Sequence, residues 1–334
     1  MKFDSIDHII LLGGSRIVAS LAEFLMKEPL FKFDIYTAPR QIDDVIYPDG
    51  STLRSFLEAR DIDYRVVDDI NKDESFINSV GYNSLGLGLG EAWPFSKELI
   101  ERFDGKLLDL MGIRLPQYRG GAHYTWQILR GNRIGACNIQ VINEDMVQGV
   151  YDSGEIVYFK EYLFSEKARI PNDYFEEAVK QEVDFVFSFI KKVNQGHEFR
   201  PFHVQENFSI LFPRLNTIKN AYLDWLWSSQ EIDRFVCAFD DPYAGCSTFL
   251  NGEKVRLKKS SFESNDGPFH SFQCGLVYKV YNGAIYICTK DGTIIIRELF
   301  DEDGNDITNH VKPGQRFYTP QEELEKAHFS SVEL

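Results

Sequence analysis

The chain has 334 residues, enough for two domains or one large one, and its 43% hydrophobic and 26% charged residues are typical of a globular protein. A formal net charge of −15 argues against nucleic-acid partners, which require concentrated basic charge to displace counterions. The longest apolar runs are too short to cross a bilayer, and the first residues lack a secretory signal, so we expect a cytoplasmic protein without a membrane span.

The five cysteines give no sign of a disulfide framework or a zinc knuckle. Their number is odd, and no two of them have the Cys-x-x-Cys spacing. We therefore expect reduced, mostly buried thiols and no metal site.

The first third of the chain alternates predicted strands and helices. His8 to Leu12 is a predicted strand, Gly13-Gly14-Ser15 a tight turn, and 17–26 a helix. The alternation continues with predicted strands at 33–37 and 64–67, predicted helices at 51–59 and 73–80, and an apolar glycine-rich stretch at 84–90. Repeated units of this kind predict a doubly wound, mostly parallel sheet covered on both faces.

Two glycine patterns in this region could serve a ligand. Gly13-Gly14 lacks the G-x-G-x-x-G spacing, so we interpret it as a strand-to-helix turn rather than a phosphate cradle. The run 86–90 has glycine at every second position, which removes the side chains from one face of a strand. Another backbone or a flat ligand could approach that face closely.

A long amphipathic helix is predicted at 173–193, and after it the sequence pattern shifts to short strands with turn signals. Beyond Pro213, a helix at 229–239 and short strands with Asn-Gly and Asp-Gly turns predict a small β-barrel-like domain. We therefore expect a first domain at 1–200, a linker at 201–212, a β-rich domain at 213–325 and a tail at 326–334.

The segment from Leu115 to Ile128 resembles the LPxYRGxxPxxW segment of the methionyl-tRNA and amino-sugar N-formyltransferases. Around it, 88–94 resembles that family's preceding loop, 135–139 its G-x-T-x-H strand and 151–156 its D-x-G-D/E-I element. In the second half, 220–225 and 242–245 are similar to the run that opens the family's C-terminal domain. The chain thus resembles the folate-dependent formyltransferases over almost its whole length.

The resemblance implies the formyltransferase fold, with an OB-like C-terminal domain, and N10-formyltetrahydrofolate as the formyl donor. In that family, the pterin is held mainly by backbone groups of one loop at the carboxyl edge of the sheet, where open α/β sheets bind ligands. The corresponding residues here are Gly88, Leu89, Gly90, Glu91, Trp93 and Pro94.

The resemblance also shows that two of the three catalytic positions of the family are substituted. Asp109, expected at the end of a strand, replaces an asparagine, Met111 replaces a histidine, and Asp152 matches the family's aspartate. An amine that attacks a formyl carbon needs a donor for the developing oxyanion and an acceptor for its proton. Methionine can be neither, and an ionised aspartate can only accept.

Three interpretations of the altered site remain open. Asp109 and Asp152 could share one proton, one serving as base and the other as donor. His123, in a predicted loop at a proline position of the family, could be the base instead. The chain could also be a catalytically silent or repurposed relative that binds a ligand or acts as a scaffold.

We expect the acceptor to be a nucleotide-linked amino sugar rather than tRNA. The family's tRNA enzymes carry a basic insertion where this chain has the net acidic stretch 39–49. A nucleotide-sugar needs only a few basic and aromatic contacts, for which the candidates are Arg114, Tyr118, Arg119 and Trp126. For Arg119, an internal ion pair is an equal alternative. The oligomeric state, a homodimer included, is left open.

Overall fold

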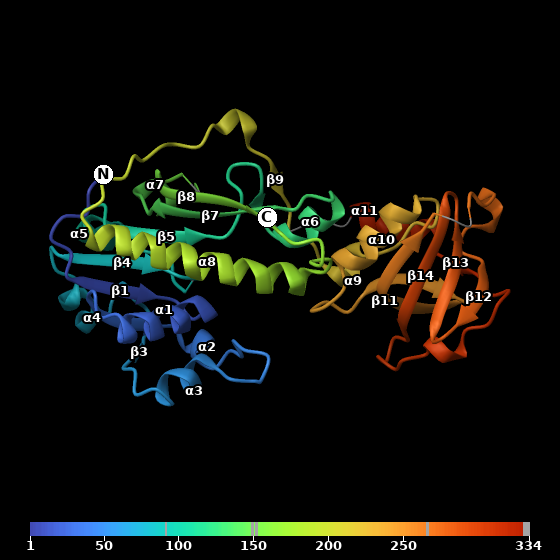
Figure 1. Cartoon of the computed structure of the whole chain (residues 1–334), viewed down its shortest axis with the longest axis horizontal. Coiled ribbons are helices and arrows are strands. Elements are labelled where there is room, and N and C mark those ends of the chain that lie inside the picture. Colours follow the sequence, from blue (N-terminus) through green and yellow to red (C-terminus); the bar gives the residue numbers. More distant parts are fainter. Residues whose placement is uncertain (91, 148–149, 151–152, 265–266, 330–334) are drawn as a thin grey trace. The chain divides into compact units, whose positions relative to one another are not determined.

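The computed structural model describes residues 1–90, 92–147, 150, 153–264 and 267–329, and the chain forms two compact units (Figure 1). Unit 1 consists of Met1–Arg119, Ile134–Leu163 and Ala178–Ile210, and unit 2 of Gly120–Arg133, Phe164–Glu177 and Leu211 onward. The units interleave along the sequence, and the domain boundaries expected from the sequence stay a prediction.

Unit 1 contains a seven-stranded sheet with the order β3-β2-β1-β4-β5-β7-β8. These strands are β1 (His8–Leu12), β2 (Lys32–Thr37), β3 (Arg65–Val66), β4 (Ser84–Gly88), β5 (Leu107–Met111), β7 (Ile134–Val141) and β8 (Ile156–Leu163). The five from β3 to β5 are parallel, whereas β7 and β8 are antiparallel to their neighbours. The predicted mostly parallel sheet is confirmed, and its antiparallel edge is an addition that the sequence pattern did not indicate.

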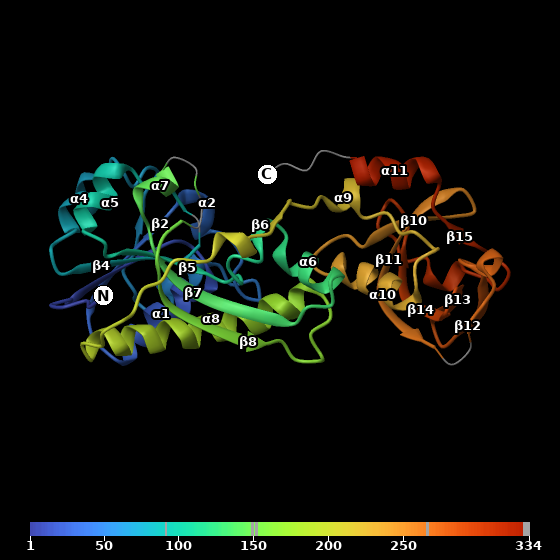
Figure 2. The same cartoon turned by 90° about the horizontal axis from the view of Figure 1, so that it is seen from above.

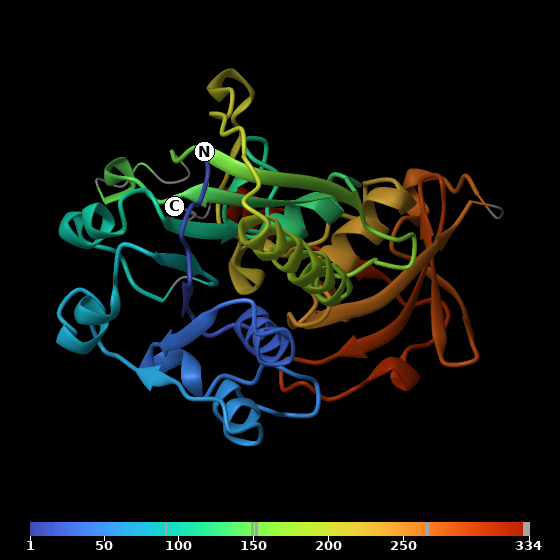
Figure 3. The ribbon, with the colours of Figure 1, turned by 60° about the vertical axis from the view of Figure 1, so that its left-hand side comes forward.

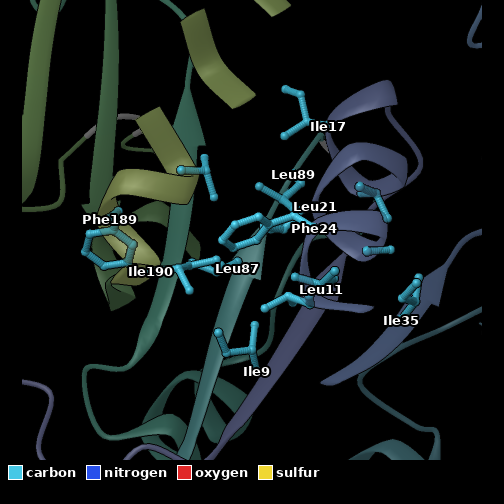
Figure 4. Packing of buried hydrophobic residues seen from close by; sticks show 14 of the residues in the cluster. Ile9, Leu11, Ile17, Leu21, Phe24, Ile35, Leu87, Leu89, Phe189 and Ile190 are labelled. Atoms are coloured by element: carbon cyan, nitrogen blue, oxygen red, sulfur yellow. The ribbon is translucent and has the colours of Figure 1, made fainter. Parts of the chain in front are cut away.

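Helices cover both faces of this sheet, α1 and α8 one face and α4 and α5 the other (Figure 2). The helices that contribute to unit 1 are α1 (Arg16–Lys27), α2 (Pro39–Ile42), α3 (Leu53–Glu58), α4 (Glu74–Ser79), α5 (Lys97–Phe103), α7 (Glu144–Val147) and α8 (Pro171–Asn194). On the first face, Leu11 and Leu87 of the strands belong to one hydrophobic cluster with Phe24 of α1 and Phe189 of α8 (Figure 4). Their exclusion from water supplies the main driving force for this packing.

Unit 2 contains a six-stranded, antiparallel, curled sheet with the order β12-β13-β14-β11-β10-β15 (Figure 3). Its strands are β10 (Cys246–Leu250), β11 (Glu253–Glu263), β12 (Val277–Tyr281), β13 (Ala284–Thr289), β14 (Gly292–Phe300) and β15 (Phe317–Tyr318). The predicted β-barrel-like second fold is confirmed. The remaining elements are β6 (Arg119–Gly120), α6 (His123–Leu129), β9 (Leu211–Phe212), α9 (Thr217–Asn220), α10 (Ser229–Ala238), α11 (Gln321–Phe329) and short 3-10 helices at Glu206–Phe208, Ser271–Gln273 and Thr308–His310.

Two tight hairpins of this sheet follow directly from the sequence. Asn251 and Gly252 join β10 to β11, and Asn282 and Gly283 join β12 to β13. All four residues have positive φ, as the type I′ turn requires, and asparagine and glycine adopt that conformation at the lowest cost.

Other expectations concern the chain as a whole. Within the described ranges, no helix is both long and apolar enough to cross a membrane. All five cysteines are free and buried, as expected.

Candidate functional site

The carboxyl end of β4 lies beside the middle of β5 and brings Gly88 next to Asp109. The two residues are register partners, and a Cβ on Gly88 would lie 2.7 Å from Oδ1 of Asp109. The missing side chain of Gly88 therefore makes room for the carboxylate. Asp109 lies within β5 rather than at its end, because the strand continues to Met111 and pairs with β7.

Met111 occupies the position where the resemblance implies a histidine. Its half-buried thioether packs against Ile113, Leu115 and Ile156. Its carbonyl accepts a hydrogen bond from Nδ2 of Asn138 at 3.3 Å. This position contributes packing and a backbone acceptor, but its side chain offers no group that could take a proton.

Gln140 of β7 is a polar residue at this edge that the sequence reasoning missed. It is the register partner of Asp109 and is fully buried, with 0% of its surface exposed. Neither Oε1 nor Nε2 of its side chain has a hydrogen-bond partner in the described part of the chain. The sequence did contain an indication of this residue. Asn138 and Gln140 are polar residues two positions apart in a mostly apolar strand, so their side chains share one face.

Two predicted site residues, Asp152 and Glu91, lie outside the described residues. The proton-sharing pair of Asp109 and Asp152 therefore stays a prediction.

The predicted folate loop begins where β4 meets the turn after β1. The buried Leu89 donates its N–H to the carbonyl of Leu12 at 2.8 Å and accepts from Oγ of Ser15 at 2.8 Å. A Cβ on Gly13 would lie 2.6 Å from the Leu89 carbonyl oxygen, so glycine is required for this close approach. Gly90 follows with φ +107° and is exposed, which leaves its backbone open to a ligand.

Trp93 anchors the far end of this loop. Its indole is buried, and Nε1 donates to the carbonyls of Val67 and Asp68, at 3.2 Å each. Pro94 is exposed, and its carbonyl accepts from Nδ2 of Asn71 at 2.9 Å. Because the indole faces the core, the loop would contact a flat ring through its backbone rather than through this side chain.

Arg119, a predicted substrate residue, forms a two-pronged ion pair with Glu206. Nη2 lies 2.8 Å from Oε1 of Glu206, and Nη1 contacts Oε2 and also Oγ of Ser209. The hydrogen bond from Arg119 lowers the pKa of Glu206 below its usual value. The internal ion pair considered from the sequence is thus present, and a substrate role for Arg119 stays a prediction.

The other three predicted substrate residues also have contacts within the protein. Nε of Arg114 donates to Oε1 of Glu161 at 2.6 Å, and Tyr118 is buried. In unit 2, Nε1 of Trp126 donates to the carbonyl of Pro213 at 2.9 Å. Their substrate roles also stay predictions.

His123 is the first residue of α6 in unit 2, so the prediction that it lies in a loop is wrong. The helix begins directly after Ala122, which has positive φ. Within the described residues, Nε2 of His123 is buried without a hydrogen-bond partner. Burial lowers the pKa of His123 to about 4, which makes the ring a weak base.

Glu182 of α8 is a second ionisable group that the sequence reasoning missed. It is 8% exposed, and burial raises the pKa of its carboxyl to about 7. A Cβ on Gly112 would collide with Oε1 of Glu182, so this carboxyl lies directly against the backbone after β5. The sequence could have predicted this burial, because Glu182 lies between Val179 and Val186 on the apolar stripe of the helix.

Comparison with known proteins relates both halves of the chain to one group of enzymes. Residues 217–311 match the formyl transferase C-terminal domain. The methionyl-tRNA formyltransferase of Fusobacterium nucleatum is 22% identical over 201 residues, which are 60% of this chain and 61% of that protein. The chain thus aligns with about three fifths of the length of this relative.

Solved structures resemble the chain over more of its length. WlaRD, a sugar 3N-formyltransferase solved with dTDP and 5-N-formyl-THF, matches 91% of this chain and 98% of its own, with a TM-score of 0.64 and 16% identity. The N-formyltransferase from Helicobacter canadensis, solved with folinic acid and dTDP-3-aminofucose, matches 87% and 98%, with a TM-score of 0.65 and 15% identity. At such identities the likeness establishes the fold. Together with the matched C-terminal domain and the sequence relatives, this fold supports the resemblance of the chain to the folate-dependent formyltransferases.

Proposed function

We propose that the chain transfers a formyl group from N10-formyltetrahydrofolate to the amine of a nucleotide-linked amino sugar. The observation that carries the proposal is the pairing of Gly88 with Asp109 at the carboxyl edge of parallel strands, where open α/β sheets bind ligands. The carboxylate of Asp109 would accept the proton that the attacking amine loses.

The folate donor is supported by the loop that follows β4. Gly13 allows the loop to lie against the first turn, and the exposed Gly90 presents backbone to a flat ring. Trp93 fixes the loop from the core side. The two sugar formyltransferases of similar fold were solved with formyl-bearing folates.

The charge of the chain favours a sugar acceptor, although the sequence relatives act on methionyl-tRNA. Residues 39–49 contain one arginine and three aspartates. That arginine, Arg40, donates to the carbonyl of Ala92 at 3.2 Å, and Asp43 is paired with Arg54 at 2.7 Å. This stretch therefore lacks the excess basic charge that binding an acceptor stem requires.

A second candidate function is ligand binding without turnover. Met111 favours it, because the thioether is packed among apolar side chains where a catalytic histidine would otherwise stand. A silent relative would bind a folate and release it unchanged.

The purified chain should be assayed with N10-formyltetrahydrofolate and either dTDP-linked amino sugars or methionyl initiator tRNA. We expect mass spectrometry to show formylated sugar and unchanged methionyl-tRNA. Formylation of the tRNA alone would contradict the proposed acceptor. A melting temperature raised by folinic acid, without transfer to either acceptor, would establish the silent relative.

A further inference from the structure

We propose that Gln140 is the oxyanion donor of this formyl transfer, acting beside the carboxylate of Asp109. The inference rests on the proposed function and deepens it. It assigns the donor that neither Asp109 nor Met111 can supply.

Register places Gly88, Asp109 and Gln140 in one row across β4, β5 and β7. Directly opposite residues of an antiparallel pair point to the same face, with Cβ atoms about 4.5–5.5 Å apart. Gly88 has no side chain, so the carboxylate and the amide are the side-chain polar groups of this row. This row crosses the sheet at the carboxyl end of β4, where the proposed function places the reaction.

The face on which the row lies follows from its neighbours. Ile139, next to Gln140 in β7, points into the core beneath α1 and α8. Leu107 and Ile142, at the alternate positions, belong to the core on the α5 side. Asp109 and Gln140 therefore share the α5 face, whereas Glu182 lies across the sheet and cannot serve as their partner.

The unsatisfied amide of Gln140 calls for an explanation. A buried polar group without a partner costs roughly 1–3 kcal/mol, and native proteins contain few of them. Asn138, two residues earlier on the same face of β7, donates to the carbonyls of Met111 and Ile113. The strand can thus satisfy a buried amide, and the one beside the proposed base is left with both atoms unpaired among the described residues.

A formyl group and an attacking amine match these two atoms. Nε2 of Gln140 would donate to the formyl oxygen as negative charge develops there, and Oε1 would accept an N–H of the amine. The bond that forms joins the amine nitrogen to the formyl carbon, and the bond that breaks joins that carbon to the donor nitrogen. Asp109 would take the proton that the amine loses and return it to the departing nitrogen, so that atoms and charge balance.

The decisive variant is Gln140→Leu, which keeps the approximate size of the side chain and removes both polar atoms. We expect kcat to fall about 10²–10³-fold, the loss seen when one oxyanion donor is removed. KM for both substrates should change less than about threefold, because the contact strengthens only in the transition state. The melting temperature should not fall, because an unsatisfied amide is replaced by an apolar group.

Thr37→Val is the matched control. Thr37 is also fully buried in this sheet, and its Oγ1 has no partner in the described part of the chain. It ends β2, which two other strands separate from β5. The control should keep the kcat of the wild type and a similar or higher melting temperature.

Gln140→Glu supplies a signature that a purely structural role would not give. A protonated carboxyl can donate to an oxyanion, whereas an ionised one repels it. Burial beside Asp109 should raise the pKa of the new carboxyl. We therefore expect kcat relative to wild type to increase as the pH falls, and the Leu variant to show no such recovery.

The outcomes separate this inference from the proposed function. If the wild type transfers formyl groups and Gln140→Leu keeps its kcat within about threefold, the donor role is wrong and the function stands. If the wild type transfers nothing, the proposed function is wrong, and the donor role falls with it. A large rise in KM at unchanged kcat would make Gln140 a binding residue and would also overturn the inference.

Discussion

Two buried polar groups, one in each unit, differ in how far their hydrogen bonds are satisfied. In unit 2, Asp240 has no exposed surface, and its carboxylate accepts from the N–H groups of Asp241 and Lys259, at 2.7 Å each. In unit 1, Gln140 is equally buried, yet its amide has no partner among the described residues. The satisfied group holds a turn against a strand, and the unsatisfied one stands opposite Asp109, at the edge where we propose that the ligands bind.

The contrast shows how structural and functional polarity can be distinguished in one chain. A buried carboxylate with two N–H donors stabilises the fold, and its loss should be seen in unfolding. A buried amide without a partner lowers stability, and the contact proposed for Gln140 would account for its presence. The predictions below test this division.

The largest expected effect is on activity, for Asp109→Leu. Removing a general base typically costs 10²–10⁴-fold, so we expect transfer to fall about 10³-fold, or about 4 kcal/mol in the activation barrier. Single-turnover formylation of the amino sugar measures it. His123→Gln is the comparison, because His123 is the alternative base. If His123→Gln abolishes transfer and Asp109→Leu has little effect, the assignment of the base is wrong.

Asp240→Ala should give the largest loss of stability. It removes two hydrogen bonds to a charged acceptor and leaves two N–H groups without their partner, for a cost of about 3 kcal/mol in the free energy of unfolding. Asp241→Ala is the control, because that side chain is half exposed and its ion pair with Lys258 contributes less than about 1 kcal/mol. Urea denaturation compares them, and equal losses would contradict the special role of Asp240.

Local signals in the sequence predicted most of the architecture. The βα alternation gave the parallel strands, and the Asn-Gly pairs gave two hairpins, because both depend on residues close together in the chain. The antiparallel edge formed by β7 and β8 was missed, since strand direction depends on pairing between distant segments. The helix that begins at His123 was missed because Ala122, which precedes it, is not one of the residues that mark a helix N-terminus.

The site was predictable only where it matched a known motif. Asp109 was found through its position relative to Leu115-Pro116, but its partner was not. Gln140 lies 31 positions further along, and only the register of β5 with β7 brings the two together. The buried state of Glu182 likewise depends on α8 packing against the sheet.

Glu182→Gln should change how stability depends on pH. Burial raises the folded-state pKa of Glu182 to about 7, above its unfolded value, so its contribution is fully present below about pH 4.5 and is lost as the pH rises through 7. We expect the variant to be more stable than wild type by about 3 kcal/mol at pH 8 and to show little difference near pH 4. Urea midpoints across this range measure the effect, and parallel curves for the two proteins would contradict it.

The smallest effect is expected for the ion pair of Arg119 with Glu206, which also tests the substrate role of Arg119. Glu206 is 66% exposed, so water screens the pair, and we expect Arg119→Gln to lower stability by about 1 kcal/mol at most. Glu206→Gln breaks the same pair but keeps the guanidinium.

If Arg119 only pairs internally, both variants should lower stability similarly and leave KM for the nucleotide-sugar unchanged. If Arg119 binds the sugar's diphosphate, Arg119→Gln should raise that KM, whereas Glu206→Gln should leave it unchanged or lower it, because the guanidinium is freed from its competing carboxylate.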